Sequence, residues 1–169
     1  TATRAAPAQE SSSPSTPLSD PDAQARLVGA LPPGYPPDSC KPMGASGAAL
    51  ARVRSSITVD PAVGPGSVTH ELMPSLGALN TAFTSIVDGT NLLTCPGDIR
   101  LSWRHPQSWP VAEKAAPDLY RGTVMCGLQQ GRPVVAWTTT DGALMVSAVQ
   151  GTSGEVTLDE LFIWWSHHS

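Results

Sequence analysis

The chain has 169 residues, 40% of them hydrophobic and only 14% charged, and its formal net charge is -4 at pH 7. This size and apolar content suit one domain with a buried core and a tail. The negative charge gives no general reason to expect nucleic-acid binding. No apolar run approaches the roughly 20 residues of a membrane span. No signal peptide is visible, so a targeting or anchoring segment is expected only upstream of Thr1.

Residues 1–19 are rich in Ala, Pro, Ser and Thr and show no apolar period. Such a segment buries too little apolar surface to offset the entropy lost on ordering, so we expect a flexible tether. Its composition is also that of segments often glycosylated on exported stalks. Residues 20–169 are then expected to form the folded domain.

A short helix is predicted directly after the tether. Asp20 can cap it, Pro21 suits its first position, and Leu27, Val28 and Leu31 provide an apolar side. The prolines of "PPGYPPDSCKP" must end this helix, because proline cannot continue one.

The following residues alternate between strand and helix signals. Period-two alternation predicts four strands, and two further segments that are apolar on both faces are typical of central strands. These segments are residues 50–57, 67–73, 99–104 and 118–130, followed by 132–140 and 143–149. Gln130-Gly131 and Asp141-Gly142 are hairpin turn signals.

Two more helices complete the predicted elements. The first covers residues 74–87, with a stripe of Leu76, Leu79, Phe83 and Ile86. The second begins at a capping box, in which Thr157 can cap the third amide and Glu160 can reach back. Its apolar stripe contains Leu158, Leu161, Phe162 and Trp165. Together the elements predict an α+β fold, a single domain with an antiparallel sheet of five or six strands and two or three helices packed on one side.

Four landmarks in order, "LPPGYPPDSC", "TCPGD", "MCGLQQGRPVVAW" and a terminal helix with "WW", resemble the PknH-like extracellular domain of mycobacteria. The resemblance covers roughly Leu27 to Ser169. That module is the sensor domain of a transmembrane Ser/Thr kinase and also occurs in secreted proteins and lipoproteins. The resemblance implies a twisted sheet with helices around a cleft, but it implies no particular ligand. The kinase motifs "HRD" and "DFG" are absent from the chain.

The three cysteines depart from the family pattern, which usually has four cysteines in two bridges. The resemblance places the missing cysteine near Ser55, so it implies that Cys40 has no partner and that Cys95 and Cys126 are the retained pair. From the residues alone, Cys95 and Cys126 could also be metal ligands or a redox pair, although neither CxxC spacing nor a neighbouring His cluster supports this. Cys40 could be a partly buried free thiol, a reactive thiol or an intermolecular bridge.

No pattern in the sequence indicates catalysis. His167 and His168 are adjacent and cannot share one helical face, so a metal site is not expected. There is no "GxSxG" around any serine. Asp159 and Glu160 suit the first turn of a helix without any catalytic role. We therefore expect no catalytic residues, no metal and no cofactor.

Arginines and one tryptophan are the candidate binding residues. Arginines alternate away from the apolar faces of their predicted strands, and they form either an ordinary solvated face or an anion-binding surface. They are Arg52, Arg54, Arg100, Arg104 and Arg121. Trp109 lies in a loop between Pro106 and Pro110, where it is either a ligand contact or rim packing. The predicted ligand-binding residues are Arg100, Arg104, Trp109 and Arg121.

These observations lead to two alternative functions. The first is a non-catalytic, extracytoplasmic ligand-binding or sensor domain of the cell envelope, whose ligand is an unidentified, anionic envelope component. The alternative is a secreted or lipid-anchored envelope protein that acts as a protein-interaction module. Either way we expect a monomer that meets an envelope small molecule or protein, meets no nucleic acid, and touches the membrane only through an N-terminal anchor.

Overall fold

The computed structural model describes residues 20–32, 35, 38–60, 64–96, 107–110, 120–152 and 154–168. These residues contain three helices: α1 (Pro21–Ala30), α2 (Leu76–Asp88) and α3 (Leu158–His168). They also contain eight strands: β1 (Cys40–Met43), β2 (Ala51–Asp60), β3 (Gly64–Leu72), β4 (Asn91–Leu93), β5 (Gln107–Pro110), β6 (Tyr120–Gln129), β7 (Arg132–Thr139) and β8 (Met145–Gly151). The predicted tether, 1–19, and the predicted strand at 99–104 lie outside the described residues.

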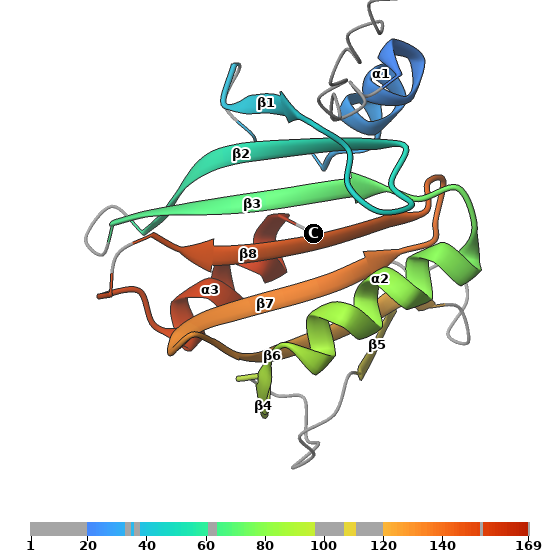
Figure 1. Cartoon of the computed structure of the whole chain (residues 1–169). Helices are drawn as coiled ribbons and strands as arrows, with labels where there is room; N and C mark the ends of the chain where they lie inside the picture. The colour runs from blue at the N-terminus through green and yellow to red at the C-terminus, as the bar shows by residue number, and fades with distance from the viewer. Residues whose placement is uncertain are drawn as a thin grey trace, which may run out of the picture.

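All of the described strands pair antiparallel in one twisted sheet (Figure 1). Seven of them follow the order β1-β2-β3-β8-β7-β6-β4, and β5 pairs with β6 next to the stretch that β4 occupies. The α+β class is confirmed, but the prediction of five or six strands was too low. It missed β1, β4 and β5, because strands of only three or four residues are too short to show a period.

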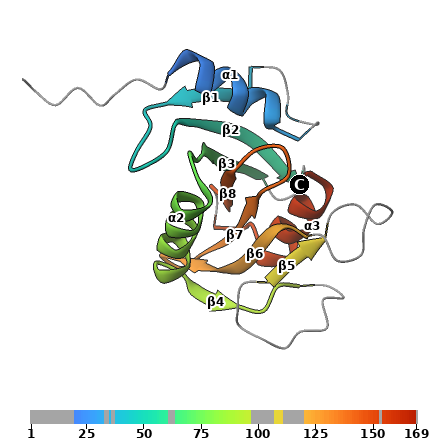
Figure 2. The same cartoon turned by 90° about the vertical axis from the view of Figure 1, so that its right-hand side faces the viewer.

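The helices cover both faces of the sheet, so the prediction that they pack on one side was wrong (Figure 2). On one face α2 places Leu79 and Phe83 against Val134 and Ala136 of β7. The opposite face carries α1 and α3, and Leu27 of α1 packs there in a cluster with β2 and β3. Both faces of the central strands are thereby buried, which explains why β7 and β8 are apolar on both sides.

The larger cluster lies between the sheet and α3. It contains Trp137 of β7, which is 1% exposed, and the α3 residues Leu161 and Trp165. Cys95 and Cys126 belong to the same cluster and are joined by a disulfide, with 5.1 Å between their Cα atoms. Since Cys95 follows β4 by two residues, the bridge ties the chain beyond this edge strand to β6.

Several local signals read from the sequence are present in the structure. Asp20 caps α1 by accepting from the Asp22 amide. The capping box of α3 is confirmed, because the Thr157 amide donates to Glu160 Oε2 at 2.7 Å and the Glu160 amide donates to Thr157 Oγ1 at 3.3 Å. Between β6 and β7, Gln130 and Gly131 both have positive φ, as the predicted tight hairpin turn requires.

Two residues assigned to apolar stripes lie at the surface instead. Leu76 is 56% exposed because Ser75 caps α2, which places Leu76 in the first turn at the end of the stripe. Val28 is 50% exposed, since its neighbour Leu27 takes the position that faces the sheet. Trp164 and Trp165 are both buried, although they are adjacent: Trp165 packs edge-on to Trp137, and Trp164 packs against Tyr35 and stacks on His168.

Candidate functional site

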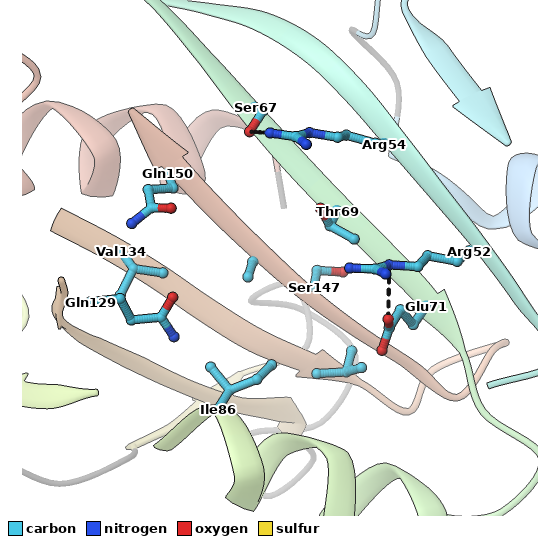
Figure 3. A pocket seen from close by; sticks show the side chains of 12 residues that line it. Arg52, Arg54, Ser67, Thr69, Glu71, Ile86, Gln129, Val134, Ser147 and Gln150 are labelled. Atoms are coloured by element: carbon cyan, nitrogen blue, oxygen red, sulfur yellow. Dashed lines mark hydrogen bonds and ion pairs between the residues drawn. The ribbon is translucent and has the colours of Figure 1, made fainter. Parts of the chain in front are cut away.

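The face of the sheet that carries α2 is only partly covered, and a polar hollow occupies the open part (Figure 3). The side chains of β2 and β3 on this face are polar, whereas those covered by α2 are mostly apolar. The hollow has a volume of about 310 Å³. Its lining consists of Arg52, Arg54, Ser67, Thr69, Glu71, Ile86, Gln129, Val134, Val146, Ser147, Ala148 and Gln150.

Strand register brings the charged residues of the hollow together. Arg52 of β2 lies directly opposite Glu71 of β3, and Arg52 Nε is 3.0 Å from Glu71 Oε1. Burial raises the pKa of the Glu71 carboxyl, and the charge of Arg52 opposes this shift. Both side chains are partly buried, so this pair is screened less than a fully exposed one.

The second arginine has no carboxylate among its described contacts. Arg54 is exposed, and its Nη2 donates to Ser67 Oγ at 3.2 Å. Arg52, Arg54 and Glu71 together give the hollow one surplus positive charge. A guanidinium that is in contact with a neutral hydroxyl and open to solvent can present its other N–H groups to a carboxylate or phosphate oxygen.

The opposite wall combines amides with an apolar floor. Gln150 comes from β8 and Gln129 from β6, and Gln129 Nε2 donates to Thr90 Oγ1 at 3.0 Å. Between them lies Val134 of β7, and Ile86 of α2 closes one side of the hollow (Figure 3). A few polar groups around an apolar floor are typical of small-molecule sites.

The opposite face of the sheet, which carries α1 and α3, holds a polar network of a different kind. Tyr35 Oη lies 2.9 Å from His70 Nε2, and His70 Nδ1 lies 2.7 Å from Ser147 Oγ. A serine next to a histidine is an arrangement used for nucleophilic catalysis. Here, however, both side chains are enclosed, with 0% of His70 and 1% of Ser147 exposed. Ser147 is also among the residues that border the polar hollow, but only 1% of it is exposed, so a substrate cannot reach this pair in the structure. The network instead ties Tyr35, before β1, to the centre of the sheet.

Burial sets the titration of this network. It lowers the pKa of His70 from 6.5 to about 3 and raises the pKa of Tyr35 above its ordinary value. The imidazole is therefore neutral near pH 7. In the described part of the chain, no group of three or more His, Cys, Asp or Glu is placed to hold a metal ion.

The predicted ligand-binding residues cannot be placed as a group. Arg100 and Arg104 lie outside the described residues. Trp109 is in β5 and Arg121 is in β6, but their side chains are outside the described set. The ligand-binding role of these four residues therefore stays a prediction.

The cysteines have the arrangement that the resemblance implied. Cys95 and Cys126 are bonded, and Cys40 is free. Cys40 lies opposite Ser55 in the β1–β2 ladder, and its Sγ contacts Ser55 Oγ. Burial raises the pKa of the Cys40 thiol, so its reactive thiolate form is disfavoured.

Sequence reasoning found part of the hollow and missed the rest. The alternation of β2 correctly placed Arg52 and Arg54 away from its buried side. Glu71 and Gln150 were missed because the pattern within one strand does not show which residues of other strands lie beside Arg52 and Arg54. A weak signal for Glu71 was available in the alternation of β3, where it lies between the buried residues His70 and Leu72.

Comparisons of the chain with protein-family models, with curated proteins and with solved structures each returned no match. The resemblance to PknH-like domains is therefore untested by them. Among the described residues, no helix is both long and apolar enough to cross a membrane. The disulfide fits an extracellular location, because such bonds persist in oxidising compartments.

Proposed function

We propose that this chain is a non-catalytic binding domain that works outside the cytoplasm, and that its ligand occupies the polar hollow on the open part of the sheet. The observation that carries the proposal is the environment of Arg54. Its guanidinium lies at a concave site with hydroxyl and amide neighbours, and its described contact is with the neutral Ser67. The ligand would be an anion, since the hollow has a surplus positive charge and Arg suits carboxylates and phosphates.

The position of the hollow supports binding more than catalysis. Its walls come from β2, β3, β6, β7, β8 and α2, so regular elements hold every side chain that lines it. Such a site is largely formed before the ligand arrives, which lowers the ordering cost of binding. The serine–histidine pair lies on the face that carries α1 and α3 and is closed to a substrate. Its enclosure leaves the hollow as the better supported candidate site.

An envelope location for this function rests on two supports. One is the disulfide between Cys95 and Cys126, and the other is the resemblance to the PknH-like extracellular domain. The alternative is a protein-interaction module that binds through Trp109 and the arginines of the bridged loop, the stretch of sequence between the bonded Cys95 and Cys126. The two functions place the ligand on different residues, so substitutions can separate them.

The test uses a mycobacterial envelope extract divided into water-soluble glycan fractions and lipid fractions. Each fraction is added to the purified chain, and the melting temperature is recorded, because a ligand that binds the native state raises it. We expect at least one fraction to stabilise the wild type and to lose most of its effect on Arg54→Gln. The matched control is Arg26→Gln, which changes an exposed arginine of α1 outside the hollow and should respond like the wild type.

Two results would reject this function. In the first, no fraction stabilises the wild type. In the second, a fraction stabilises Arg54→Gln and the wild type equally, which would mean that the ligand binds to another surface. If Trp109→Ala then removed the effect, the bridged loop would be the binding surface instead.

A further inference from the structure

A second hollow adjoins the polar one along α2. It lies between α2 and the chain that connects β1 to β2, and its volume is about 480 Å³. Its lining contains Ser46, Gly47, Ala48, Glu71, Met73, Ala78, Thr81, Ala82, Ser85 and Ile86. Apolar atoms dominate this wall, in contrast to the mixed wall of the polar hollow.

The two hollows meet at two residues, Glu71 and Ile86, which line both of them. Ile86 of α2 points toward the sheet beside the polar hollow (Figure 3). At the same boundary, Glu71 forms the ion pair with Arg52, so the arginine balances the negative charge of the carboxylate. A ligand that passes along Ile86 therefore meets an apolar side chain and a neutralised carboxylate rather than a bare charge.

We propose that the ligand is a single-chain amphiphilic carboxylate, with its head on Arg54 and its hydrocarbon chain in the apolar hollow beside α2. This inference rests on the proposed function and names the ligand class for the same site. Charge complementarity selects an anionic head, because Arg54 supplies the surplus positive charge of the polar hollow. The apolar wall next to it selects a hydrocarbon tail, since each methylene removed from water contributes favourably to binding.

The chemistry excludes ligands that match only one of the two hollows. A compact inorganic anion would satisfy Arg54 but leave the wall of α2 exposed to water. An amphiphilic cation would fit the apolar hollow but place its charge beside a guanidinium, which repels it. Only an anion with an attached chain uses both halves.

The test is a titration of the full chain with hexanoate, octanoate, decanoate and dodecanoate, kept below their micelle concentrations and followed by calorimetry. We expect the affinity to rise by up to about fourfold per added methylene, as burial of each CH₂ predicts. Arg54→Gln should weaken every member of the series by a similar factor, about tenfold, because each head loses a charge-assisted hydrogen bond. Decyltrimethylammonium should bind much more weakly than decanoate.

A matched pair of α2 variants tests where the chain lies. Ser85 is exposed and lines the apolar hollow, so Ser85→Phe should fill it, lower the affinity for decanoate and leave hexanoate much less affected. Asn80 is exposed on the same helix but lines neither hollow, so Asn80→Phe should bind like the wild type.

The inference fails if affinity does not depend on chain length, if the cationic amphiphile binds as well as decanoate, or if the two α2 variants behave alike. These failures differ from those of the proposed function. Binding of the short acids that depends on Arg54 but not on chain length would keep the polar hollow as the site and reject the amphiphile. The same separation follows if an envelope fraction without acyl chains stabilises the protein through Arg54 and decanoate does not bind.

Discussion

Acid should destabilise this fold through one buried histidine. His70 is 0% exposed, and its ring contacts Tyr35, Ser147 and Trp137, none of which carries a charge between pH 4 and 8. Protonation would place a cation on an imidazole that burial keeps neutral, with a folded-state pKa of about 3. In the unfolded chain the same imidazole binds its proton at the ordinary pKa of about 6.5.

The size and sign of the effect follow from these two pKa values. At pH 8, well above 6.5, His70 is almost fully neutral in both states, and its contribution to stability is fully present. Between 6.5 and 3 the unfolded state binds one more proton, so the free energy of unfolding falls by up to about 1.4 kcal/mol per pH unit. At pH 5, which is 1.5 units below the ordinary value, the titration of His70 should lower the free energy of unfolding by about 2 kcal/mol relative to pH 8.

Urea unfolding at several pH values between 8 and 4 measures this cost. Other groups titrate in the same range, so the useful quantity is the difference between variants. His70→Gln should be less stable than the wild type at pH 8, but it should lose about 2 kcal/mol less between pH 8 and pH 5. His167→Gln is the control, because it removes an exposed histidine of α3 that takes no part in the buried network. Equal losses for His70→Gln and the wild type would show that the histidine is not held neutral, and the reasoning would be refuted.

Two further predictions concern the cysteines. Replacing Cys95 and Cys126 together by Ala should lower the free energy of unfolding by about 4 kcal/mol in the chain-entropy model, because the bridge closes a loop with a sequence separation of 31. Urea unfolding with and without the bridge checks this, and an unchanged midpoint would contradict it. Ser55→Cys should form a second disulfide with Cys40, since the two side chains already touch across the ladder. Closing that shorter loop should add about 3 kcal/mol before strain. Peptide mapping without reduction detects the bond, and a Cys40 thiol that still reacts with a thiol reagent would count against it.

The misplacement of the helices shows how sequence signals can be combined wrongly. The segments of β7 and β8 were recognised as apolar on both faces, which already requires a cover on both faces. The apolar stripes of α2 and α3 therefore had to pack on opposite faces of the sheet. The prediction placed both helices on one side because it did not treat the two faces of these strands separately. In the structure Val134 packs against α2, and its neighbour Val135 belongs to the core beside α3.

The hollow shows what remains beyond local patterns. Arg52 and Arg54 could be placed on the exposed side of β2 because alternation is a property of the strand itself. Their partners Glu71 and Ser67 depend on the register of β2 with β3, which a sequence of this kind does not display. Register is fixed by long-range burial, since a slip of one residue would turn the buried side of β3 toward solvent. The short strands β1 and β4 likewise owe their existence to the neighbours they pair with.

One strand, β3, connects the folding prediction for His70 with the binding proposed for the polar hollow. Its buried residues Val68, His70 and Leu72 contribute to the core, and the residues between them, Ser67, Thr69 and Glu71, line the hollow. The register that enforces burial on one side therefore also sets the positions of the binding groups on the other. The ion pair of Arg52 with Glu71 lies across this same register, while Arg54 contacts only a neutral hydroxyl among the described residues. A change at Arg54 should consequently alter binding with little effect on folding, whereas a change at His70 should alter folding first and binding only through it.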